Sequence, residues 1–270
     1  MAIMVTSWAE FVAAVGTSGA DVVLPEDAVW DMNEITPTFA QDLTISCATV
    51  NGRGTEIKNL HITGRITINH TAISNLAITN ILGDWTGSGT TGQKAFFLCS
   101  NAPSLTDCTF SGVFGTGYDA MLYMSNASSQ NMVRMERCAM NMIFNGGITV
   151  AGGGLDLYAC RLVISLEAAT GVVRVPKSEY CEFVVNAPTA TAFNALGPSC
   201  TLRGNLQNCT MVYGTTKNAA AGVFSTASAP NASPPSDTGY KIYGVSDTQS
   251  NPQMKDAEYL QSLGFLIGDD

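Results

Sequence analysis

Hydrophobic and variable residues alternate in short segments of this chain, and one six-residue form of the alternation recurs five times. It consists of an apolar or small residue, two variable residues, a cysteine, one variable residue and a large hydrophobic residue. Period-two alternation predicts β-strands with one buried face, not helices. The five copies are Leu105–Phe110, Met135–Met140, Leu157–Leu162, Ser178–Phe183 and Leu206–Met211.

The cysteines of these copies are 30, 22, 21 and 28 residues apart. A solenoid coil of three short strands and their turns needs roughly 20 to 25 residues, so each interval fits one coil, two of them with an added loop. Equivalent positions on stacked coils form a column of like side chains. We therefore predict an all-β, single-stranded parallel β-helix with an inward ladder made of Cys108, Cys138, Cys160, Cys181 and Cys209.

The repeat extends upstream, where Leu60 and Leu76 stand in the cysteine position of two similar segments, Ile57–Ile62 and Ile73–Ile78. Glycine-rich segments interrupt the predicted coils at 83–92, 112–117 and 152–154, and we expect them to form projecting loops. Cysteine suits the interior of such a ladder because it is small, apolar and commonly buried.

The two ends of the chain differ from the repeat. Ser7 and Glu10 form a predicted capping box for a helix over residues 8–15, which would cover the open end of the solenoid. We divide the chain into a capping helix (1–20), the β-helix (21–217), an Ala/Ser/Pro-rich linker or arm (218–239) and a closing segment (240–270). The closing segment should contain a strand at 240–245 and a helix near 256–263, docked on the last coil or on a neighbouring subunit. Its apolar tail, a predicted oligomer contact, is Phe265, Leu266 and Ile267.

Composition excludes several functions. Only 13% of residues are charged, so Thr, Ser, Asn and Gly must cover the surface. The net charge is -9 and the thirteen basic residues are scattered, which argues against nucleic acid as a partner. No apolar stretch is long enough for a membrane span, and the first basic residue, Arg53, lies too late for a secretory signal. We expect synthesis in a cytoplasm, with free thiols.

Metal and catalytic motifs are missing as well. No Cys-x-x-Cys pair occurs and His61 and His70 are the two histidines, so we predict no metal or cofactor. Neither a nucleophile elbow nor a phosphate loop is present. No two acids of the central region are adjacent or two residues apart, the spacing that would place both on one strand face. These acids are Asp84, Asp107, Asp119, Glu136, Asp156, Glu167, Glu179 and Glu182.

Alignment on the cysteines brings charges on neighbouring coils together. It places Asp107 beside Arg137 and Glu182 beside Arg161, and it forms a column of Glu136, Tyr158 and Glu179. Opposite charges on adjacent strands are typical of surface ion pairs, so we predict no catalytic residues. A polysaccharide-degrading site built from carboxylates on different coils stays open as an alternative.

A capping helix, a Cys-x-hydrophobic ladder and the lack of an export signal together resemble the parallel β-helix proteins of bacteriophage virions, which are tailspikes, fibres and capsid-decorating proteins. The segment Met254–Ile267, with its Leu-Gly-Phe, looks like the closing segment of such proteins. The resemblance implies a non-enzymatic virion protein, a homotrimer that contacts other capsid or tail proteins and host-surface glycans. The alternatives are a tailspike or lyase that degrades polysaccharide, and a bacterial surface adhesin.

Overall fold

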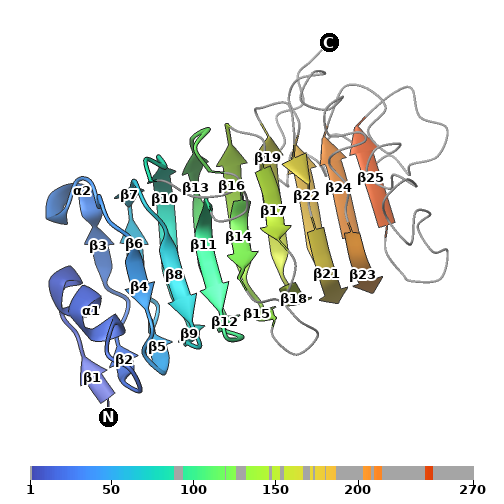
Figure 1. The fold of residues 1–270 in the computed structure, drawn as a ribbon. Coiled ribbons are helices and arrows are strands. Elements are labelled where there is room, and N and C mark those ends of the chain that lie inside the picture. The colour runs from blue at the N-terminus through green and yellow to red at the C-terminus, as the bar shows by residue number, and fades with distance from the viewer. Residues whose placement is uncertain are drawn as a thin grey trace.

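The computed structural model of the chain is a parallel β-helix, as the cysteine repeat predicts (Figure 1). It describes residues 2–87, 94–118, 120–125, 132–145, 148–152, 155–166, 171–172, 174–179, 181–186, 203–207, 210–214 and 241–245. Beyond residue 145, side chains are described for 155–163 and Cys181. Successive strands of each coil enter three different sheets, and every strand pairing is parallel.

Sheet A holds nine strands within the described residues: β1 (Ala2–Met4), β2 (Asp21–Val23), β5 (Thr49–Asn51), β9 (Ala72–Ser74), β12 (Ser104–Thr106), β15 (Val133–Glu136), β18 (Leu155–Tyr158), β21 (Arg174–Glu179) and β23 (Arg203–Gln207). Sheet C holds six in the same part of the chain: β4 (Leu43–Ile45), β8 (Ile66–Asn69), β11 (Ala95–Ser100), β14 (Ala120–Met124), β17 (Ile148–Gly152) and β20 (Gly171–Val172).

Sheet B follows sheet A in each coil and contains the strands that come after the ladder cysteines. These strands are β3 (Val29–Asp31), β6 (Glu56–Lys58), β7 (His61–Ile62), β10 (Ala77–Gly83), β13 (Thr109–Phe114), β16 (Ala139–Phe144), β19 (Arg161–Leu166), β22 (Glu182–Asn186), β24 (Thr210–Gly214) and β25 (Lys241–Val245). The strand predicted at 240–245 is thus present as β25, and it pairs with β24 of the same chain.

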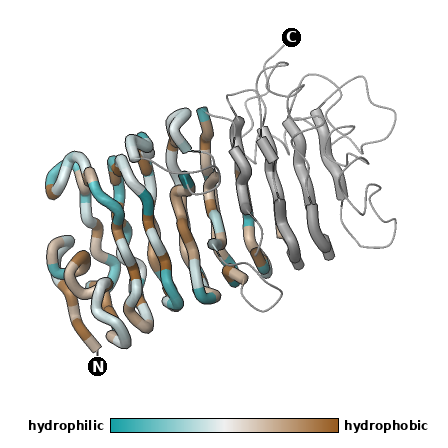
Figure 2. Tube along the Cα trace, viewed as in Figure 1, coloured by the Kyte–Doolittle hydropathy of each residue, from teal (hydrophilic) through white to brown (hydrophobic). Residues whose placement is uncertain are grey.

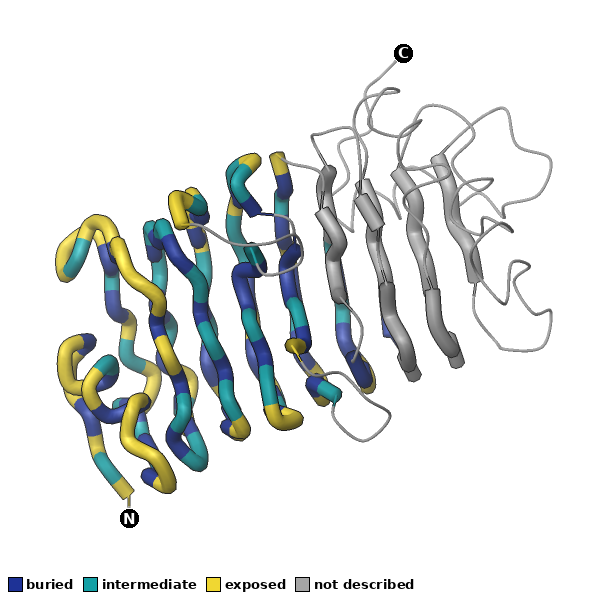
Figure 3. The backbone as a smooth tube through the Cα atoms, viewed as in Figure 1, coloured by how far each residue is buried: buried dark blue, intermediate teal, exposed yellow. Residues whose placement is uncertain are grey.

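The core runs along the axis of the solenoid because alternate side chains of all three sheets point inward. Ile66 and Ile68 are buried whereas Thr67 between them is partly exposed, and the same alternation is visible in the coloured part of the chain (Figures 2 and 3). Aromatic rings stack between coils, for example Phe114 on Phe144, with centroids 5.1 Å apart. Such in-register burial along every coil supplies most of the stability of a solenoid.

The predicted helix is confirmed as α1 (Trp8–Val15), which lies across the first coil. Trp8 and Phe11 are buried against it, and the Val15 carbonyl accepts hydrogen bonds from two backbone amides ahead of β5. The Ser7 hydroxyl accepts from Glu10 N at 3.3 Å, as a capping box requires. The Glu10 carboxylate, however, accepts from the amide and hydroxyl of Thr6. A second helix, α2 (Met32–Ile35), follows β3.

The predicted loop at 112–117 is strand in its first half, because β13 runs to Phe114, and a turn follows in its second half. Gly112 lies inside β13 and pairs with Ile81 of β10. The pairing skips a residue between Ile78 and Ile81, so β10 has a bulge there, and Asn80 occupies it with a φ of 51°. The glycine is needed for close approach and not for a turn, because a Cβ at position 112 would lie 2.4 Å from the Ile81 carbonyl oxygen. No described helix has the length and hydrophobicity needed to span a bilayer.

Candidate functional site

The corner between sheets A and B carries the recurring motif, and backbone hydrogen bonds connect it from coil to coil. Thr109 N donates to the Leu76 carbonyl at 3.0 Å, and Ala139 N donates in the same way to Cys108 at 2.9 Å. We call the buried residues at this corner the ladder column. Its described members are Thr55, Leu76, Cys108, Cys138, Cys160 and Cys181. Cys209 lies outside the described residues.

Leu60 is not a member of the ladder column, contrary to the sequence alignment. Ile57 pairs with Ile78 in sheet B, so the segment that resembles Ile73–Leu76 lies one strand further round the coil. Both segments share a local conformation, since Asn59 and Asn75 have φ values of 60° and 51°. Thr55 takes the ladder place on this coil, and its hydroxyl donates to the Pro25 carbonyl.

The ladder thiols are held by carbonyl groups. Cys108 donates to the Thr106 carbonyl of its own coil at 3.3 Å and to the Ile73 carbonyl of the preceding coil at 3.7 Å. Cys138 and Cys160 make the same two kinds of contact, at 3.3–3.4 Å. Each sulfur therefore has a weak donor role that ties two coils together.

The cysteines of the described residues are free thiols. Burial raises the pKa of Cys99 and of Cys47. The pKa of Cys138 is raised by hydrogen bonding with the Cys108 and Cys160 thiols and by burial. Cys108, Cys138 and Cys160 are buried and their thiols donate to backbone carbonyl groups, so this column is structural.

Each ladder residue from Thr55 to Cys160 follows a residue in the left-handed conformation. Because the side chain of that residue is directed away from the core, a second column runs along the outside of the corner. Asn and Asp tolerate this conformation through local hydrogen bonding, and glycine has no Cβ to obstruct it. The column contains Asp27, Gly54, Asn75, Asp107, Arg137 and Ala159, with φ values of 49° to 84°.

The ion pair predicted between neighbouring coils is confirmed. The Arg137 guanidinium donates two hydrogen bonds to Asp107, at 2.7 and 2.8 Å, and also binds Glu136. This hydrogen bonding to Arg137 holds the pKa of Asp107 below its ordinary value. Two carboxylates on neighbouring coils therefore share one cation, an arrangement suited to holding the surface together.

Strand register also confirms the other predicted columns. Glu136 pairs with Tyr158 and Tyr158 with Glu179, while Arg161 pairs with Glu182. Asp156 lies 3.7 Å from Arg134 on the neighbouring coil. Of the other acids considered as catalytic candidates, Asp119 and Glu167 lie outside the described residues, as does the apolar tail Phe265, Leu266 and Ile267.

Asp84 belongs to a separate group, which lies where strand β10 of sheet B ends. It lies 3.2 Å from His61 Nε2, and His61 Nδ1 lies 3.2 Å from the Thr38 hydroxyl. These three residues come from three successive coils and are exposed or half-exposed. Within the described chain no group of His, Cys, Asp or Glu is arranged to hold a metal ion.

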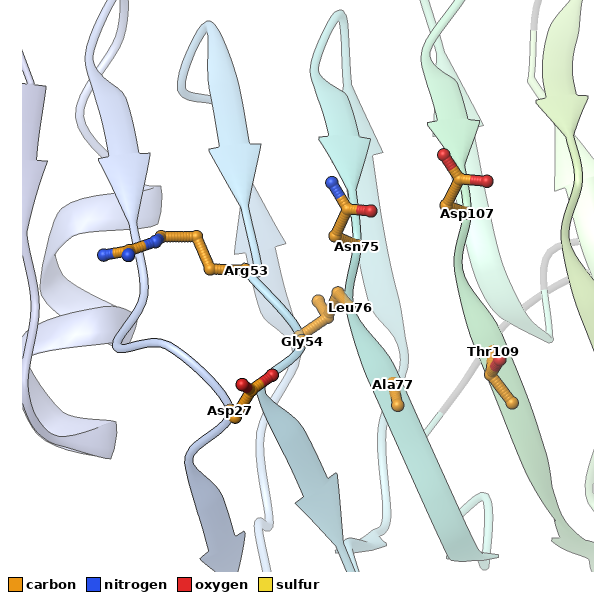
Figure 4. A pocket seen from close by; sticks show the side chains of 8 residues that line it. All are labelled: Asp27, Arg53, Gly54, Asn75, Leu76, Ala77, Asp107 and Thr109. Carbon is orange, nitrogen blue, oxygen red and sulfur yellow. The ribbon is translucent and has the colours of Figure 1, made fainter.

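A pocket of about 320 Å³ lies on the outer column, and Figure 4 shows its lining. We call it the corner pocket. It forms where the number of residues between a strand of sheet A and the following strand of sheet B changes. Four residues separate β5 from β6, but two separate β9 from β10 and β12 from β13. The longer corners of the early coils therefore leave a hollow beside the shorter ones. The lining residues are Asp27, Arg53, Gly54, Asn75, Leu76, Ala77, Asp107 and Thr109.

Two charged residues of the corner pocket already have partners. Arg53 extends away from the pocket (Figure 4). It binds Glu26, and Asp107 binds Arg137. The side chains of Asp27, Asn75 and Thr109, by contrast, have no hydrogen-bond or ion-pair partner among the described residues. They supply mainly oxygen acceptors beside an apolar floor made by Leu76 and Ala77.

Sequence reasoning did not single out Asp27 or Asn75. Asn75 could have been found, because it directly precedes a ladder residue as Asp107 does, whereas Asp27 lies on a coil that lacks the repeat. Comparison with protein-family models, with curated proteins and with solved structures gave no match to this chain.

Proposed function

We propose that this chain is a non-enzymatic structural component of a bacteriophage virion, a stiff rod exposed on the capsid or tail. In this proposal it assembles as a homotrimer, contacts other virion proteins and touches host-surface glycans. The single observation that supports it best is the continuous parallel pairing of described strands from β1 to β25.

Rigidity is what such a ladder provides. An interior strand such as β13 is hydrogen-bonded on both sides, to β10 and β16, so it can open only by breaking two pairings. The first strands of the three sheets are only three residues long, which limits uncontrolled edge pairing. A rod of this kind resists proteases and shear, as an exposed virion part must.

The charges support a role without catalysis. Asp107, Glu136 and Asp84 are each bound to a basic or imidazole group. Glycosidase chemistry needs one carboxylate with a raised pKa beside a second, ionised one. The lowered pKa of Asp107 is of the opposite kind.

The test is the composition of the particle and the mass of the isolated protein. Peptides of the chain should be detected by mass spectrometry in gradient-purified phage particles from the host that carries the gene. Light scattering during size-exclusion chromatography should give three times the 28.4 kDa chain mass at micromolar concentration. A monomer, or particles that lack the chain, would overturn the proposal.

The enzymatic alternative has its own signature. Release of reducing sugar from host-surface polysaccharide, abolished by Glu167→Gln or Glu182→Gln, would show a depolymerase instead. Isolation of the chain from an intact bacterial surface would favour the adhesin.

A further inference from the structure

Negative charge is concentrated at the N-terminal end of the rod. Residues 1–52 include seven acids and no lysine or arginine, whereas residues 53–270 hold fifteen acids and all thirteen basic residues. The seven acids are Glu10, Asp21, Glu26, Asp27, Asp31, Glu34 and Asp42.

The next coil neutralises part of this charge. Its three basic residues each bind one acid of the coil before, and no basic residue is left there for the corner pocket. These pairs are Arg53–Glu26, Lys58–Asp31 at 3.2 Å and Arg65–Asp42 at 3.1 Å. Asp27 is therefore an uncompensated carboxylate at the acidic end of the rod.

The corner pocket gives this carboxylate a defined setting. A Cβ at Gly54 would lie 2.3 Å from Asp27 Oδ1, so the carboxylate lies directly against this glycine. Asn75 and Thr109 contribute further oxygen atoms two and three coils further along the rod (Figure 4). Asp107 is held by Arg137. Leu76 and Ala77 offer an apolar floor suited to a methylene chain.

We propose that the corner pocket binds a lysine or arginine side chain of a partner protein, with Asp27 as its counter-ion. A cationic head group supplies the opposite charge that Asp27 lacks, and its methylene chain can lie on Leu76 and Ala77, whereas an anion would be repelled and a neutral ligand would leave Asp27 without an opposite charge. The inference goes beyond the structural role, because it names the chemistry of a partner that docks at the acidic end.

Titration of the full chain with pentalysine at low salt tests the proposal, followed by calorimetry. Asp27→Asn should weaken binding about tenfold, the usual effect of losing a charge-assisted hydrogen bond. Glu34→Gln is the matched control: it removes the same charge at the same end of the rod, but from an exposed residue outside the pocket. It should weaken binding less than about twofold, the effect of long-range attraction alone.

A second variant tests the pocket without a change in charge. Ala77 is partly exposed on the outer face of β10, so Ala77→Leu should fold normally and fill the floor. It should reduce pentalysine binding as much as Asp27→Asn does. Equal weakening by Asp27→Asn and Glu34→Gln, no effect of Ala77→Leu, or binding of neutral dextran oligosaccharides in place of pentalysine would each overturn the proposal. None of these outcomes depends on whether the chain is found in particles.

Discussion

The ladder column shows which property of a side chain matters at the A–B corner. Cysteine thiols and the Thr55 hydroxyl both donate to nearby carbonyl groups, while Leu76 only fills space. All three are accommodated because the position is dry and bounded by carbonyl oxygens. A carboxylate at this position could not donate a hydrogen bond to those carbonyl oxygens and would be repelled by them.

Cys160→Asp should therefore destabilise the protein strongly. Cys160 is 2% exposed and its thiol donates to the carbonyls of Met135 and Tyr158. An unpaired buried carboxylate should lower the free energy of unfolding by about 3 kcal/mol or more, measured by urea denaturation. Asn141→Asp, at an exposed position of β16, should change it by less than about 0.5 kcal/mol. Equal effects would show that position 160 is not buried.

The Asp107–Arg137 pair predicts a dependence of stability on pH. Because the pKa of Asp107 is lowered by Arg137, its contribution is fully present above about pH 4, the ordinary aspartate value, and is lost as the pH falls through the lowered pKa. The thermal midpoint of the wild type should therefore fall more between pH 5 and pH 2 than that of Asp107→Asn. Asp27→Asn should retain the pH dependence of the wild type, and an identical profile for Asp107→Asn would contradict the prediction.

Among the elements, β10 and β13 show how a strand can be mistaken for a loop. The bulge at Asn80 brings the backbone of β10 against Gly112, so a glycine that looks like a turn signal is a packing requirement. Nothing in the local sequence of β13 reveals this, because the cause lies in a strand some thirty residues earlier.

Gly112→Ala should lower the free energy of unfolding by roughly 1–3 kcal/mol, the usual range for overpacking, because its Cβ would lie 2.4 Å from the Ile81 carbonyl oxygen. Gly16→Ala is the control: its φ is -78° and the nearest atom to a new Cβ lies 3.8 Å away. That change should be close to neutral in chemical denaturation. A neutral Gly112→Ala would mean that β10 and β13 do not approach this closely.

At the scale of the whole molecule, the fold could be predicted because one corner repeats its chemistry. The cysteine spacing defines the coil, and period-two alternation defines the buried face. The position of a segment around the coil was harder to predict: Ile57–Leu60 and Ile73–Leu76 share a pattern and a left-handed Asn, yet lie in different places. Local sequence encodes conformation there, while the neighbouring coils decide the place.

The corner pocket could not be predicted for a similar reason. It depends on a change in corner length between successive coils, and on Asp27, Asn75 and Thr109 being brought together from three of them. Each residue alone looks like an ordinary surface position. Only the stacking of the coils places these residues around one pocket.

The covering of the first coil by α1 gives the stack a direction. Trp8 and Phe11 close the core at that end, so an extra coil cannot be inserted in front of them without a new lid. Duplication of a later coil meets no such obstacle, since it adds one more strand to each sheet in the same register. Descendants of this gene should therefore differ in the number of coils that follow the first one, while the N-terminal end covered by α1 is retained.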